Sequence, residues 1–152
     1  MPSKDFDKKF QDLCQKILQV ASEFVDYNDK EVDAIYFFGA REQKVSYTQT
    51  FYKINGKIVE LHEVNHALKR KVDNSSLRIS GLLDENLNLL EEISNLFIAD
   101  NREVPTQIKI SYFSKLKKSE TKLDYGFHFS NHKTLRVDNV FDRWVEQIRS
   151  EN

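Results

Sequence analysis

Residues 44–60, KVSYTQTFYKINGKIVE, predict a β-hairpin. The first part, Lys44–Ile54, alternates and is rich in Thr, Tyr and Phe, as strands are. Asn55-Gly56 then supplies the two positive-φ positions of a type I′ turn, so residues 57–60 are expected to return as a second strand. Because a tight hairpin joins antiparallel neighbours, the sheet that contains it is expected to be antiparallel.

Three further strands are expected outside this hairpin. Val32–Gly39, VDAIYFFG, is a nearly continuous run of aromatic and β-branched residues, which predicts a central strand buried on both faces. Residues 106–113, TQIKISYF, and residues 122–129, KLDYGFHF, alternate cleanly. Their alternation predicts one apolar face, formed by Ile108, Ile110, Tyr112, Leu123, Tyr125, Phe127 and Phe129. The opposite face, with Gln107, Lys109, Ser111, Lys122, Asp124 and His128, is expected to be solvent-exposed.

Apolar residues at helical spacing predict the remaining elements. The expected helices are residues 4–26, a short piece over residues 63–72, a longer helix carrying Leu83, Leu87, Leu90, Ile93 and Phe97, and a last helix from about Asp138. Val140, Phe141, Trp144, Val145 and Ile148 should be the buried side of that last helix. The order α-β-β-β-α-α-β-β-α predicts an α+β domain over residues 1–152, with helices flanking an antiparallel sheet of about five strands.

Composition excludes several classes of protein. The chain has 152 residues, with 23 basic and 24 acidic side chains, so no excess of charge directs it to nucleic acid or to a membrane. Cys14 is the single cysteine, which rules out an intramolecular disulfide. The charged N-terminus lacks the apolar run of a signal peptide, and no stretch approaches the roughly 20 apolar residues of a membrane span. We therefore expect a cytoplasmic protein.

Residues 62–66, HEVNH, match the zinc-protease pattern H-E-x-x-H, in which two histidines bind zinc and the glutamate is the general base. This pattern predicts a small zinc metallopeptidase with His62 and His66 as ligands and Glu63 as base. The third ligand is unspecified. Lys69 and Val72 replace the glycine and histidine of the longer metzincin pattern, although Glu85, Glu91 or Glu92 could substitute.

The helical geometry of this segment favours a different interpretation. At about 100° per residue, Leu61, Val64, Leu68 and Val72 form an apolar face, and the two histidines project roughly 130° away from it. Exposed histidines at a corner between hairpin and helix are therefore the preferred interpretation. Since no other catalytic set, glycine-rich phosphate loop or cofactor motif is present, the residues favour a binding protein without metal or cofactor.

Four phrases carry a family resemblance: FYKINGKIVELHEVN, NREVPTQIKISYF, KLDYGFHFSNHKTL and DNVFDRWVEQI. Together they resemble the YezG-like immunity proteins of bacterial polymorphic toxin and contact-dependent growth inhibition systems, from about Phe37 to the C-terminus. The resemblance implies a cytoplasmic α+β protein that binds and neutralises a cognate toxin C-terminal domain, often a nuclease, without catalysis. It also implies that HEVNH is not an active site.

Acidic side chains are the candidate toxin contacts, because they can steer a basic partner surface. They are Asp84, Glu85, Glu91, Glu92, Asp100 and Glu103. For each of them the alternative is an ordinary solvated helix face. We expect a monomer before toxin binding, with no direct contact to nucleic acid or membrane.

Overall fold

The computed structural model describes residues 4–131 and 133–152, and its elements follow the predicted order closely. The fold is α+β, as the sequence predicts. The elements are α1 (Lys4–Phe24), β1 (Val32–Glu42), β2 (Val45–Ile54), β3 (Lys57–Glu60), the 3₁₀ turn η1 (Leu61–Glu63), α2 (Val64–Ala67), α3 (Ser76–Ala99), β4 (Gln107–Phe113), β5 (Lys118–Asp124) and α4 (Val137–Ser150).

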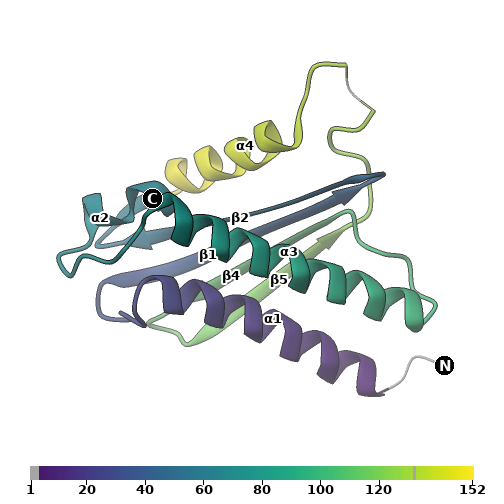
Figure 1. Ribbon diagram of the computed structural model, residues 1–152, viewed down its shortest axis with the longest axis horizontal. Coiled ribbons are helices and arrows are strands. Elements are labelled where there is room, and N and C mark those ends of the chain that lie inside the picture. Colours follow the sequence, from purple (N-terminus) through teal and green to yellow (C-terminus); the bar gives the residue numbers. More distant parts are fainter. Residues whose placement is uncertain (1–3, 132) are drawn as a thin grey trace.

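A five-stranded sheet forms the centre of the molecule, with strand order β3-β2-β1-β4-β5 (Figure 1). All neighbouring strands are antiparallel. Asn55 and Gly56 have φ angles of 49° and 82°, so the predicted turn between β2 and β3 is confirmed. The apolar strand β1 lies in the middle, where both of its edges are hydrogen-bonded.

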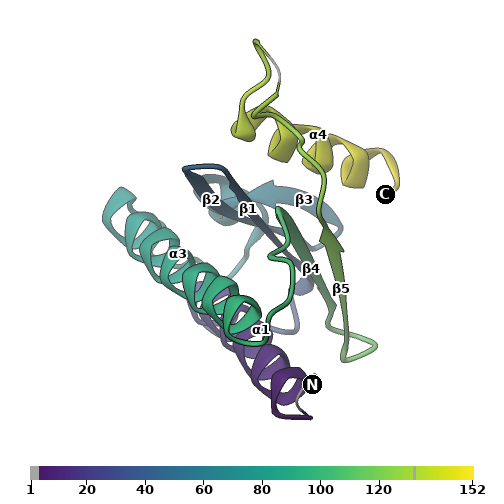
Figure 2. The ribbon, with the colours of Figure 1, turned by 90° about the vertical axis from the view of Figure 1, so that its right-hand side faces the viewer.

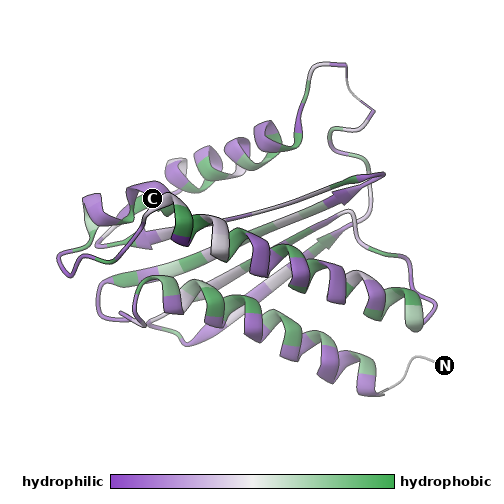
Figure 3. Ribbon diagram, in the orientation of Figure 1, coloured by the Kyte–Doolittle hydropathy of each residue, from purple (hydrophilic) through white to green (hydrophobic). Residues whose placement is uncertain are grey.

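Helices cover the two faces of the sheet unequally. α1 and α3 lie side by side on one face, and α4 lies alone on the other (Figure 2). Hydrophobic and hydrophilic residues alternate along α1 and α3 at helical period, as expected for helices with one buried side (Figure 3). The edge strand β5 has only exposed residues.

Strand β1 separates two apolar clusters, which explains its unbroken hydrophobic sequence. Ile35 and Phe37 point into the cluster under α1 and α3. Tyr36 and Phe38 point into the cluster under α4, where they meet Trp144. The prediction of a strand buried on both faces is confirmed, because successive side chains of a strand point to opposite faces.

Gly39 lets α3 approach the sheet closely. A Cβ atom at this position would lie 3.0 Å from the Phe37 ring and 3.2 Å from Cδ1 of Leu90. A side chain at this position would therefore require Phe37 and Leu90 to shift by a few tenths of an ångström.

The last strand begins and ends earlier than the sequence predicts. β5 is Lys118–Asp124, and the prediction of a strand over residues 122–129 is wrong in this respect. The strand ends where the Asp124 carboxylate accepts a hydrogen bond from Gly126 N (3.1 Å). Tyr125 and Phe127 therefore leave the sheet and are 42% and 57% exposed. Phe129 is buried, but in the α4 cluster and not on the face of Ile108.

The sheet face that carries Gln107 and Lys109 is less exposed than the sequence predicts. The alternation predicts that this face is solvent-exposed, but α4 covers its β4 part. Gln107 is only 7% exposed, and the Lys109 ammonium lies 5.0 Å from the centre of the Trp144 ring. The prediction holds for the outermost strand, where Lys122 and Asp124 are exposed.

Residues 63–72, which the sequence predicts to be one short helix, are only partly helical. α2 ends at Ala67, because Leu68 adopts an extended conformation. The loop that follows is held by side chains. Asn65 bonds both the N–H and the carbonyl group of Val72 (2.9 and 2.7 Å), and the Glu31 carboxylate accepts the backbone N–H groups of Lys69 (2.7 Å) and Arg70 (3.2 Å).

The contribution of the Glu31 carboxylate to the stability of the fold should depend on pH. Hydrogen bonds to its carboxylate, first from Lys69 N and then from the Asn55 amide, lower the pKa of Glu31 from 4.5 to about 2. A carboxyl group whose folded-state pKa is depressed stabilises the fold above its unfolded-state pKa and loses this effect as the pH falls. We expect Glu31→Gln to lower Tm above pH 4.5, and the difference from wild type to shrink as the pH falls towards 2.

Thermal melts of both proteins across this pH range check the prediction. Asp29→Asn, two residues away in the same loop, is the matched control. A Tm difference for Glu31→Gln that stays constant from neutral pH down to pH 2 would contradict the assignment.

Candidate interaction surfaces

The outward side of α3 carries four of the six predicted toxin contacts. Asp84, Glu85, Glu91 and Glu92 are all exposed. They lie on one side because Leu82, Leu89, Leu90, Ile93 and Phe97 turn the other side of the helix towards the sheet. We call this set of four carboxylates the α3 acidic face.

Few cations neutralise the α3 acidic face. Arg78 is the only basic residue of α3. Its guanidinium donates hydrogen bonds to the carbonyl groups of Phe24 (3.0 Å), Glu23 (2.9 Å) and Asp73 (2.7 Å), which fastens α3 to the end of α1. Arg41 on β1 lies 4.0 Å from one Glu91 oxygen. The face therefore keeps a negative potential on a helix that is held firmly.

Asp100 and Glu103 lie apart from the α3 acidic face. Asp100 follows the last turn of α3 and accepts a hydrogen bond from Nε of Arg102 (2.7 Å), whose guanidinium lies 3.8 Å from the centre of the Phe6 ring. Glu103 is exposed at a hollow of about 460 Å³, which Phe6, Phe10, Phe97, Leu123 and Tyr125 also line. The six predicted contacts thus belong to two separate surfaces.

An anchored loop after β5 exposes aromatic side chains that the sequence places in the core. The buried Glu42 carboxylate accepts hydrogen bonds from His128 N (2.8 Å), Ser130 N (3.1 Å) and the Ser130 hydroxyl (2.7 Å). These hydrogen bonds keep the pKa of Glu42 below its ordinary value against the opposing effect of burial. Tyr125 and Phe127 lie just before these anchored residues, and both side chains are exposed. Gly126, which lies between them, is the residue from which the end of the strand could have been predicted.

The HEVNH segment forms the corner between β3 and α2. His62 lies in η1 and His66 in α2, and both side chains are exposed while Leu61, Val64 and Leu68 are buried. The Glu63 carboxylate accepts a hydrogen bond from Glu60 N (3.0 Å) and lies 3.6 Å from Arg149 of α4. Within residues 4–131 and 133–152, no group of three or more His, Cys, Asp or Glu side chains is placed to hold a metal ion.

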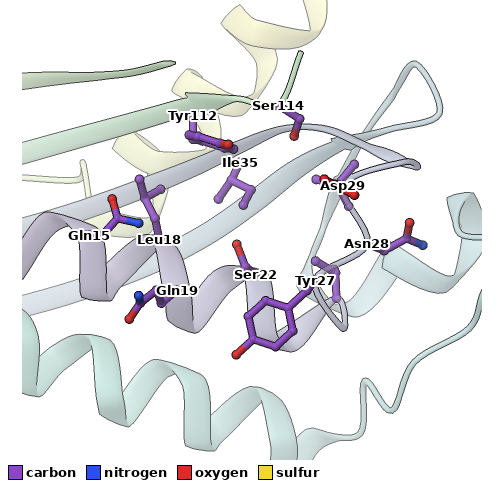
Figure 4. Close-up of a pocket in the computed structure, with 12 residues that line it drawn as sticks. Gln15, Leu18, Gln19, Ser22, Tyr27, Asn28, Asp29, Ile35, Tyr112 and Ser114 are labelled. Carbon is purple, nitrogen blue, oxygen red and sulfur yellow. The ribbon is translucent and has the colours of Figure 1, made fainter. Parts of the chain in front are cut away.

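A separate hollow of about 390 Å³ lies between α1 and the ends of β1 and β4 (Figure 4). Leu18 and Ile35 give it apolar walls, and Gln15, Gln19, Asn28, Ser22 and Ser114 bring amide and hydroxyl groups. Asp29 adds a carboxylate to this lining. None of the predicted site residues lines it.

Comparison with models of known protein families gives no match to this sequence, and no curated protein is significantly similar to it. In the part of the chain that the structure describes, no helix is both long enough and apolar enough to cross a membrane.

Proposed function

We propose that this chain is an immunity protein of the YezG-like type, which binds a cognate toxin domain in the cytoplasm and neutralises it without turnover. The α3 acidic face carries the proposal. The kinship with the YezG-like proteins rests on the phrases and the order of elements described above, and it is part of the same proposal.

A nuclease is the kind of toxin that fits this face. Nucleases bind the phosphate backbone and therefore present a basic surface, which an anionic helix complements. Because Arg78 fastens the start of α3 to α1, the helix backbone that carries the carboxylates does not have to be ordered on binding. Binding through such a surface blocks the toxin by occupancy and needs no catalytic group.

Co-expression tests this function. The chain is expressed together with a cognate C-terminal toxin domain, sought in the gene next to its own, and we expect the cells to survive and the toxin to be recovered intact. His62→Ala, Glu63→Gln and His66→Ala variants should protect as well as wild type, because the α3 acidic face does not include these residues. Death of the cells despite expression of both proteins would refute the proposal. Protection that requires the three residues and leaves the toxin cleaved would establish a metallopeptidase instead.

A further inference from the structure

A hollow of about 270 Å³ between α4 and β4 brings together cationic and apolar groups from three segments. Lys109 comes from β4, His128 and Leu135 from the loop after β5, and Arg143 and Trp144 from α4. None of these residues belongs to the α3 acidic face, which lies on the opposite side of the sheet (Figure 2).

Lys109 is the central group of this hollow. It is half-buried, and its ammonium lies over the Trp144 ring at 5.0 Å. Burial lowers the pKa of Lys109, the positive charge of Lys122 adds to this effect, and the Asp124 carboxylate opposes it. None of the ion pairs among residues 4–131 and 133–152 involves Lys109, so its charge is held there without a carboxylate in contact.

Arg143 places a second cation at the same hollow. Its side chain is exposed and takes part in none of the ion pairs found in the described parts of the chain. The amide groups of Gln107 and Gln147 also line the hollow and can donate hydrogen bonds.

One carboxylate, that of Asp124, opposes these cations. Its Oδ1 accepts a hydrogen bond from Gly126 N (3.1 Å), which lowers the pKa of Asp124, and the same oxygen lies 3.2 Å from Nε2 of His128. Two cations without carboxylate contacts therefore face one anion, which already accepts a hydrogen bond from Gly126 N. An added anionic group would find complementary charge here, in a site that is partly shielded from water.

We propose that this hollow binds a small organic anion, whose carboxylate or phosphate group lies between Lys109 and Arg143 and whose apolar body contacts Leu135 and Val140. The volume and the lining together suggest this class, since the apolar wall would add nothing to the binding of a bare inorganic ion. The site goes beyond the proposed immunity function and requires no toxin.

Trp144 provides a direct test, because it is the only tryptophan of the chain and lines the hollow. The purified protein is titrated with phenyl phosphate and with benzoate while Trp144 fluorescence is followed, with inorganic phosphate and benzyl alcohol as partial probes. We expect a saturable change with at least one of the two aromatic anions, and binding at least tenfold weaker for either partial probe. The stronger of the two anions identifies the preferred head group.

Lys109→Gln and Arg143→Gln should each weaken binding of that anion at least tenfold, whereas Lys115→Gln, in the exposed β4–β5 turn, should leave it unchanged. Arg143 is exposed, so its variant reports on binding even if replacement of Lys109 disturbs the fold. The proposal is overturned if neither anion gives a saturable change, if benzyl alcohol binds as tightly as the anions, or if Arg143→Gln binds like wild type.

Discussion

Trp144→Ala is expected to destabilise the protein by about 3–5 kcal/mol, the range for removing a large aromatic side chain from a core. Trp144 is 6% exposed and lies at the centre of the cluster under α4. Its ring packs edge-to-face against the rings of Phe51 and Tyr36, with ring centroids 5.1 Å and 5.9 Å apart. For a chain of this size the loss corresponds to a Tm lower by about 6–20 °C, measurable by circular dichroism.

The physical reason is that α4 covers its face of the sheet alone. No neighbouring helix can move in to fill the space that the indole leaves, so a cavity remains and the Phe51 and Tyr36 rings lose contacts. Phe127→Ala is the matched control, since it removes an aromatic ring that is 57% exposed. Equal melting temperatures for the Trp144→Ala and Phe127→Ala variants would show that α4 does not stabilise the fold in this way.

Charge reversal on the α3 acidic face is expected to weaken toxin binding at least a hundredfold, or about 3 kcal/mol. The double variant Glu85→Lys/Glu92→Lys replaces two exposed carboxylates with ammonium groups that would face a basic partner. Like charges at an interface repel, and electrostatic steering is lost together with the attraction. Surface plasmon resonance should show a slower association rate, and the effect should diminish at high salt.

Asp5→Lys/Asp12→Lys on α1 is the control for this reversal. The two pairs have the same seven-residue spacing on exposed helix positions and change the net charge equally. A difference between the two variants therefore reports on the location of the charges and not on their sum. If both weaken binding to the same degree, the α3 acidic face is not the contact surface.

Local chemistry explains which parts of the fold are predictable. The Asn55-Gly56 turn and the apolar run of β1 follow from backbone conformation and burial, so their boundaries agree with the structure to within a few residues. The face that α4 covers is a tertiary property. Alternation around Lys109 shows that two sides exist, but not which of them receives a helix.

The end of β5 shows the same limit at the scale of a few residues. Alternation in residues 122–129 is equally compatible with a strand and with an extended loop. The Asp124–Gly126 hydrogen bond and the Glu42 carboxylate, which comes from β1, fix the loop. The Asp124–Gly126 hydrogen bond joins residues two positions apart, so the sequence could have predicted it. The hydrogen bonds to Glu42 join residues that are far apart in the chain, so the sequence alone does not show them.

The candidate surfaces divide in a similar way. Helical period alone brings the four carboxylates of the α3 acidic face together, so this part was predictable. Asn101 has a φ of 55°, and the chain changes direction there, which separates Glu103 from the helix face. The hollow around Lys109 draws on β4, a loop and α4, and no sequence spacing links these segments.

Isothermal titration of the purified chain with the purified toxin domain tests the central claim most directly. An immunity protein must capture nearly all of its toxin at low cellular concentration, so we expect one-to-one binding with a Kd in the nanomolar range or tighter, about −12 kcal/mol. Toxin activity should fall in proportion to the chain added and reach zero at equimolar amounts. The absence of binding heat at micromolar concentrations, with toxin activity unaffected by an excess of the chain, would contradict the account.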